Sequence, residues 1–136
     1  LDGPVTSGDS VTLTASDTAA FNDNVVFNAG VSVAAATDVS LNAGDNIPTI
    51  PASVAISAGS GAGMLAIAVD APGTDADIGV GGSVTFQGTI TASTLTMVGG
   101  DDDDILDASG AKEKGYRPEV VDVLQEAHHC VPGESG

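Results

Sequence analysis

Residues 1–111 contain no lysine, arginine, histidine, glutamate, tyrosine or cysteine, and the whole chain contains no tryptophan. Most enzyme mechanisms need a cationic or near-neutral side chain to move a proton or to hold an anion. These absences therefore exclude most classes of enzyme, together with metal sites built on nitrogen ligands. The chemistry that remains uses carboxylate, hydroxyl and backbone oxygen atoms, which suit calcium.

Positive charge is scarce, because 136 residues include 3 Lys and Arg against 19 Asp and Glu, a formal net charge of −16. A chain without a cationic surface releases no counterions from a polyanion, so we expect no binding to nucleic acid or to anionic membranes. No apolar run approaches about 18 residues, so we expect no membrane insertion. The hydrophobic fraction of 42% nevertheless predicts a folded core built from small residues.

The single cysteine excludes a disulfide framework. The chain opens with Leu1 and shows no signal-peptide pattern, which favours a piece of a longer protein whose export signal lies elsewhere. Basic residues and glutamate appear abruptly after Gly110. We therefore expect a body over residues 1–110 and a tail of different character over residues 111–136.

A short unit with apolar residues at alternate positions recurs through the body and ends each time in a small residue. The units begin at Val11, Val25, Val39, Val54 and Val84, and the first four are about 14 residues apart. Alternation with a period of two predicts half-buried strands. Short strands at near-constant spacing favour an all-β fold, the parallel β-helix or β-solenoid, with right-handed coiling expected. A β-sandwich is the alternative, although no Asn-Gly or Asp-Gly turn lies between the units.

The same alternation predicts which side chains point inward. The predicted core consists of Val11, Leu13, Val26, Leu41, Val54, Ile56, Val84, Phe86 and Leu95. The pattern breaks over residues 70–82, which are polar and rich in turn formers and predict a protruding loop. Two prolines in residues 45–53 predict a smaller irregularity that is not a central strand.

The tail follows a different pattern over residues 117–130, where Pro118 and Glu119 resemble the start of a helix. Its apolar residues Val120, Val121, Leu124 and Ala127 fall on one helical face. This predicts a short helix of about three turns, with a frayed extension as the alternative. Glu126, His128 or His129, and Cys130 could ligate zinc on such a helix, but a plain amphipathic tail is favoured.

The strongest local signal is an acidic run that follows two glycines. The predicted calcium ligands are Gly99, Gly100, Asp101, Asp102, Asp103, Asp104 and Asp107. The glycines are expected to let the backbone turn so that its carbonyls face a cation, Asp104 to supply a carboxylate, and Leu106 to point into the core. Adjacent carboxylates repel one another, and a hard divalent cation relieves that repulsion. A solvated acidic turn is the alternative.

This run resembles the calcium-binding nonapeptide of RTX proteins, with Asp102 in place of the third glycine. The next nine residues do not repeat the pattern, so one unit supplies half of such a site. Together with the strand units, residues 10–110 resemble segments of large secreted bacterial repeat proteins, the RTX-type and filamentous-haemagglutinin-like adhesins. The resemblance implies a secreted or cell-surface protein with a structural or adhesive role. It implies a cell-surface glycan or neighbouring repeats of the parent chain as partners.

Three other features of the sequence are weaker signals of function. Asp70, Asp75 and Asp77 form a second cluster of oxygen ligands in the predicted loop. The pairs Thr12/Thr14, Thr89/Thr91 and Thr94/Thr96 could order water on a flat face, as ice-binding proteins do, although threonine is also an ordinary strand residue. Paired aspartates can cleave glycosidic bonds, which makes a carbohydrate-active β-helix enzyme fragment the competing function. The body lacks the basic and large aromatic residues that hold sugars, so we predict that the chain is not an enzyme.

Overall fold

The structure, a computed structural model, describes residues 1–16, 23–70, 81–100, 104–114 and 117–122, with the backbone alone over 112–114 and 117–122. These residues form strands and one short 3-10 turn, η1 (Gly59–Gly61). The strands are β1 (Val5–Ser7), β2 (Val11–Ala15), β3 (Ser32–Ala35), β4 (Val39–Ala43), β5 (Ile47–Ile50), β6 (Ala55–Ala58), β7 (Met64–Ala68), β8 (Ser83–Phe86), β9 (Thr89–Thr91), β10 (Thr94–Gly99), β11 (Ile105–Asp107), β12 (Lys112–Lys114) and β13 (Arg117–Asp122).

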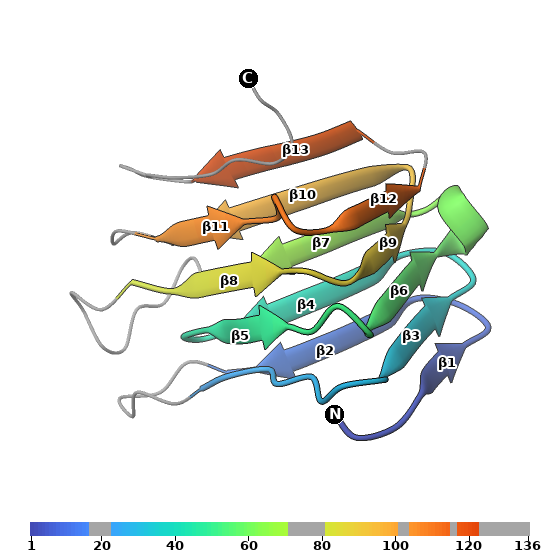
Figure 1. The fold of residues 1–136 in the computed structure, drawn as a ribbon, viewed down its shortest axis with the longest axis horizontal. Coiled ribbons are helices and arrows are strands. Elements are labelled where there is room, and N and C mark those ends of the chain that lie inside the picture. Colours follow the sequence, from blue (N-terminus) through green and yellow to red (C-terminus); the bar gives the residue numbers. More distant parts are fainter. Residues whose placement is uncertain (17–22, 71–80, 101–103, 115–116, 123–136) are drawn as a thin grey trace.

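Three parallel sheets run along the molecule. Sheet A has the order β1-β3-β6-β9-β12, sheet B the order β2-β4-β7-β10-β13, and sheet C the order β5-β8-β11. The chain visits sheet A, then B, then C, and repeats, so each turn of chain forms a coil that stacks on the one before (Figure 1). Every strand pair in the described residues is parallel, so the predicted all-β parallel β-solenoid is confirmed and a sandwich is excluded.

We number the coils by their strands: coil 1 contains β1 and β2, coil 2 β3 to β5, coil 3 β6 to β8, coil 4 β9 to β11, and coil 5 β12 and β13. The third side of coil 1 is formed by residues 23–28. Its backbone is bonded to coil 2, where Asp45 N–H donates to the Asp23 carbonyl at 3.0 Å. Val25 N–H donates to the Asn46 carbonyl at 3.2 Å.

One coil is longer than the spacing of the strand units in the sequence. Hydrogen bonds between neighbouring coils join residues from 21 to 37 positions apart. Val11 and Val39 therefore align in sheet B, two units apart, while Val25 lies on the third side of coil 1. The spacing of about 14 residues corresponds to part of a coil, and successive units lie on different faces of the solenoid.

The core lies between the three sheets, and aligned positions along a sheet bury similar residues. In sheet B, Leu13, Leu41, Ile67 and Met97 occupy one such column. Seven of the predicted core residues are buried: Val11, Leu41, Val54, Ile56, Val84, Phe86 and Leu95. Leu13 is partly buried. Burial of one such aliphatic side chain contributes about 1.5–3 kcal/mol, so stacked columns are the main source of stability.

Val26 was predicted in the core and is 45% exposed instead. Its neighbours Val25 and Phe27 are buried. Three consecutive apolar residues fit either strand register, and a shift by one residue moves every side chain to the opposite face. The register that buries Phe27 places the largest side chain of the three inside.

Residues 45–53 contain a strand, β5, and the expected irregularity falls within it. The register between β5 and β8 shifts between Ile47 and Ile50, around Pro48. β5 lies at the edge of sheet C, where a proline removes no essential donor. The predicted loop over 70–82 lies for the most part outside the described residues, which include only Asp70, Gly81 and Gly82 from it.

The predicted helix is wrong for the residues described, because Arg117–Asp122 forms strand β13, which pairs along the whole of β10. β12 likewise pairs with β9. The exposed backbone of β9 and β10 offers parallel pairing, and Val120 and Val121 are β-branched residues that suit it. Strand pairing thus continues past Gly110, while a domain boundary at that point stays a prediction.

Charged residues are absent from the strands of the first three coils. No charged residue occurs in β1 to β10, and Asp107 in β11 is the first in a strand. The described aspartates of the body lie instead mainly at the corners, where the chain passes from one sheet to the next. Among the described residues, no helix is both long and apolar enough to cross a membrane.

Candidate functional site

Aspartates and glycines gather where the chain passes from sheet B to sheet C, which we call the B–C corner. It contains residues 23–24 of coil 1, 44–46 of coil 2, 69–70 and 82–83 of coil 3, and 99–100 and 104 of coil 4. Asp45, Asp70 and Asp104 are 1%, 3% and 1% exposed. Buried carboxylates are costly without hydrogen-bond partners, so their surroundings define what the corner can do.

Asp104 and Asp45 make the same contact two coils apart. The Asp104 Oδ1 atom accepts a hydrogen bond from Gly82 N–H at 2.8 Å. The Asp45 Oδ2 atom accepts one from Asp23 N–H at 2.7 Å. In both cases the bond spans 22 residues and joins the carboxylate to the backbone of the preceding coil. The two side chains therefore fasten coil 2 to coil 1 and coil 4 to coil 3.

The second oxygen of Asp45, Oδ1, is buried and has no hydrogen-bond partner among the described residues. A buried carboxylate oxygen without a donor loses its hydration without compensation. Asp45 thus has one hydrogen-bonded and one unsatisfied carboxylate oxygen in the corner.

Gly99 and Gly100 have a different role from the one expected. Neither has a positive φ angle, so no turn requires a glycine there. A Cβ atom on Gly99 would overlap the carboxyl group of Asp104, and one on Gly100 would overlap the carbonyl of Asp70 and lie 2.7 Å from its Oδ2. The two glycines make room for the two buried carboxyl groups, which consequently flank the same dipeptide.

A ladder of amide side chains runs beside these carboxylates. Asn24 Oδ1 accepts from Asn46 N–H at 3.0 Å, and Asn46 Oδ1 accepts from Ser83 N–H at 2.9 Å and from the Ser83 hydroxyl at 3.1 Å. Each bond joins one coil to the next, so the ladder continues through coils 1, 2 and 3. It supplies acceptors for backbone N–H groups at the corner, where the chain passes from one sheet to the next.

Asp45, Asn24 and Asn46 were not selected from the sequence, although a signal exists. Asp23-Asn24-Val25 recurs as Asp45-Asn46-Ile47, and Asp23 and Asp45 are 22 residues apart. A search for strand units alone passes over this repeat because its polar residues precede the strand.

The predicted calcium ligands are only partly brought together. Asp101, Asp102 and Asp103 lie outside the described residues. Asp107 lies beyond the corner, on β11, where its Oδ1 accepts from Ser109 N–H at 2.8 Å and from the Ser109 hydroxyl at 2.6 Å. Leu106 is buried, as expected. The described residues contain no group of three or more acids, histidines or cysteines that could hold a metal ion.

The remaining predicted sites are dispersed or not described. Asp70 reaches the corner, whereas Asp75 and Asp77, and the zinc ligands over 126–130, lie outside the described residues. Thr89 and Thr91 belong to sheet A, and the other two threonine pairs to sheet B. In sheet B, Thr94 aligns with Met64, while Thr12 aligns with Ser40. The pairs therefore do not stack into a continuous threonine array.

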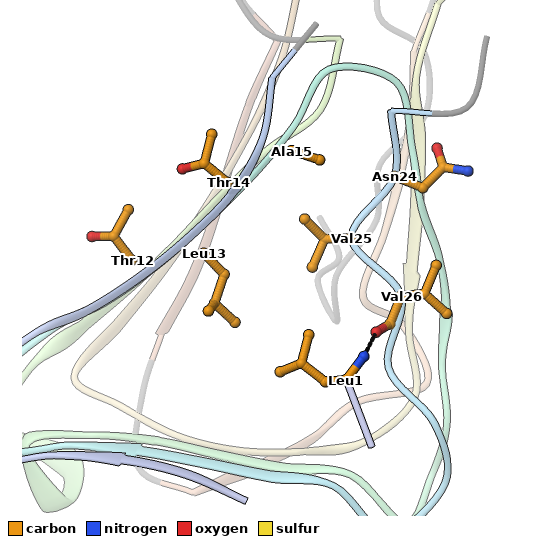
Figure 2. A pocket seen from close by; sticks show the side chains of 8 residues that line it. All are labelled: Leu1, Thr12, Leu13, Thr14, Ala15, Asn24, Val25 and Val26. Carbon is orange, nitrogen blue, oxygen red and sulfur yellow. Dashed lines mark hydrogen bonds between the residues drawn. The ribbon is translucent and has the colours of Figure 1, made fainter. Parts of the chain in front are cut away.

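The described part of the chain also contains a groove of about 450 Å³ at the coil 1 end of the core, shown in Figure 2. Its lining consists of Leu1, Thr12, Leu13, Thr14, Ala15, Asn24, Val25 and Val26. Leu13 and Val25 point into the groove from opposite walls, while Thr12 and Thr14 point away from it (Figure 2). No carboxylate lines it, so it offers no pair of acids for glycoside cleavage.

Comparisons with protein-family models, with curated proteins and with solved structures find no match for this chain. The resemblance to secreted repeat proteins therefore stays a prediction. The structure establishes the architecture, a parallel β-solenoid with buried aspartates at one corner and no charged residue in β1 to β10.

Proposed function

We propose that the chain is a structural or adhesive β-solenoid segment of a large extracellular protein, stabilised by calcium at the B–C corner. The observation that carries the proposal is the distribution of charge. β1 to β10 carry no charged residue, whereas buried aspartates line one corner. Flat, uncharged faces suit packing against other surfaces, and acids held at a corner suit a cation that links coils.

The described residues supply two carboxyl groups for calcium, those of Asp70 and Asp104 on either side of Gly99-Gly100. Asp101 to Asp103 follow directly in the sequence and would complete the oxygen ligands. Calcium takes six to eight oxygen ligands, so the site needs these residues as well. With a partial set of ligands, we expect weak binding, with a dissociation constant of about 10⁻⁴–10⁻³ M.

Calcium should raise the free energy of unfolding by about 1.4–2.7 kcal/mol at 10 mM, if it binds only the folded chain with that affinity. Denaturant unfolding with 10 mM Ca²⁺ and with a chelator measures this difference. Asp104→Asn is the informative variant because its amide oxygen can still accept from Gly82 N–H while the charge is removed. We expect it to lose most of the calcium effect.

Asp38→Asn is the matched control, because Asp38 Oδ1 accepts from Met64 N–H at 2.8 Å at the corner between sheets A and B. It should keep the full calcium effect. Coincident unfolding curves with calcium and with chelator would remove calcium from the proposal. Release of reducing ends from a panel of anionic polysaccharides would instead establish the enzyme alternative.

A further inference from the structure

One position at the B–C corner is occupied by an aspartate in three of the first four coils. Asp45 N–H donates to the Asp23 carbonyl at 3.0 Å, and Asp23 N–H donates to the Asp45 Oδ2 atom at 2.7 Å, so Asp45 of coil 2 stacks on Asp23 of coil 1. The register of sheet C continues this column with Gly82 in coil 3 and Asp104 in coil 4. Asp45 therefore lies at the joint between coils 1 and 2, and Asp104 at the joint between coils 3 and 4.

The Asp45 carboxylate is held at its joint by only one of its two oxygen atoms. The Asp45 side chain belongs to a residue that is 1% exposed, so water does not hydrate it. Its Oδ2 atom accepts from Asp23 N–H, whereas its Oδ1 atom is buried and has no hydrogen-bond partner among the described residues. Buried charges in proteins are paired with an opposite charge or coordinate a metal ion. The Oδ1 atom therefore needs a cationic partner.

The chain offers no lysine or arginine near Asp45 to play that part. Residues 1–111 contain neither, and Lys112, Lys114 and Arg117 all belong to coil 5. Coil 5 is three coils away from coil 2, or about 14 Å at the usual separation of neighbouring strands. The described backbone contacts of Asp45 with the next coil add only a hydrogen bond from Asp70 N–H to the Asp45 carbonyl, at 3.2 Å. The opposite charge must therefore come from the solution.

We propose that Asp45 binds a monovalent alkali cation, sodium or potassium, at the joint between coils 1 and 2, with Oδ1 as the charged ligand. The described residues contain no group of three or more acids, histidines or cysteines here, so one carboxylate with neutral oxygens balances a single positive charge. Neutral oxygens of the adjoining coil are the Ala15 and Asp23 carbonyls, which accept from Gly44 N–H at 2.8 Å and from Asp45 N–H at 3.0 Å and each keep a second lone pair. This site uses none of the residues proposed for calcium.

Urea unfolding of the original chain at constant ionic strength tests for this cation. NaCl is exchanged for choline chloride at a total of about 0.5 M with a chelator present, so that screening of the net charge of −16 is the same in every mixture. Choline is too large for a buried single-ion site. Sodium that binds only the folded chain should raise the ratio of folded to unfolded chain, and the log–log slope of that ratio against sodium concentration should approach about one. KCl replaces NaCl in a parallel series. Coincident unfolding curves in NaCl, KCl and choline chloride would overturn the proposal.

Two variants of equal net charge assign the effect to Asp45. Asp45→Asn removes the charge but keeps an oxygen that can accept from Asp23 N–H, and it should lose the dependence on sodium. Asp38→Asn removes one charge from an exposed residue whose Oδ1 accepts from Met64 N–H, and it should keep the slope of the original chain. Because both variants carry the same net charge, non-specific attraction of cations is matched. An equal sodium dependence in the two variants would overturn the proposal.

Asp104→Asn separates this site from the proposed calcium site. It should lose the calcium effect and keep the sodium dependence, because Asp104 fastens coil 4 to coil 3 whereas Asp45 fastens coil 2 to coil 1. Asp45→Asn should do the reverse. Since the two sites use different residues, failure of the calcium proposal leaves the expected sodium dependence unchanged. A calcium effect that disappears in Asp45→Asn would assign a divalent cation to Asp45 and reject the monovalent site.

Discussion

At the scale of single residues, glycine determines where a carboxylate can be buried in this fold. Neither Gly99 nor Gly100 has a positive φ angle, yet the space that a side chain would need contains the carboxyl groups of Asp104 and Asp70. The glycine pair and the acids thus form one packing unit, whether or not a cation joins them.

Gly99→Ala should lower the free energy of unfolding by about 1–3 kcal/mol, because the new methyl group displaces the Asp104 carboxyl from Gly82 N–H. Urea denaturation followed by circular dichroism measures the change. Gly8→Ala is the matched control, since a Cβ atom there meets nothing within 4 Å. It should be neutral or slightly stabilising. If both variants are equally stable, the Asp104 carboxyl does not occupy the space beside Gly99.

At the scale of elements, the corners contribute as specifically as the sheets. The ladder through Asn24, Asn46 and Ser83 supplies acceptors for backbone N–H groups that no strand can satisfy. Hydrogen-bonded residues of neighbouring coils are 21 to 37 positions apart, so the loops differ in length and fixed contacts must restore the strand register after each corner. The amide ladder does this between β4 and β5 and again at the start of β8.

Asn46→Ala should cost about 1–3 kcal/mol of stability, because Ser83 N–H and its hydroxyl lose their acceptor in a partly buried position. A double-mutant cycle with Ser83→Ala should show clear coupling by thermal unfolding. Asn42→Ala provides the comparison, since the Asn42 amide makes only a 3.4 Å contact with the exposed Thr14 hydroxyl. An equal loss in both asparagine variants would contradict a specific role for the ladder.

Trypsin offers a direct test of β12, because Lys112 and Lys114 are the only lysines and Arg117 precedes a proline that blocks cleavage. β12 pairs with β9, so cleavage requires local opening of that strand. We expect the native chain to resist trypsin and to become sensitive at urea concentrations below the global transition. Rapid native cleavage that leaves a folded fragment would show that β12 does not stay paired.

Part of this architecture could be predicted from alternation and spacing, which identified β2, β4, β6 and β8 and most of the core. They did not predict β5, β7 or β9, and the unit that begins at Val25 forms no strand. Alternation alone could not choose between registers at Val25-Val26-Phe27, because three apolar residues satisfy both. Nor could it reveal the length of a coil, since units on different faces carry the same pattern. The tail appeared helical because Pro118 and Glu119 suit a helix start, but the free edge of β10 supplies tertiary pairing that overrides local preference.

The candidate site was predictable only in part, for a different reason. Asp104 and the two glycines were found because they are adjacent in the sequence. Asp45 and Asp70 join them through coil stacking, which depends on loop lengths that the sequence does not express as a pattern. The local repeat Asp-Asn before Val25 and Ile47 was the available signal for the ladder.

At the scale of the whole molecule, three parallel sheets enclose one apolar core that runs through successive coils.

The coil-by-coil stacking also has a mechanical consequence. Tension applied between the first and last coils acts across the strands, so it separates neighbouring coils one at a time instead of shearing whole sheets. Each separated coil releases a length of 21 to 37 residues, or about 70–130 Å of extended chain at 3.3–3.6 Å per residue. A surface protein built from such coils would lengthen in steps under load while it stays attached to its surface.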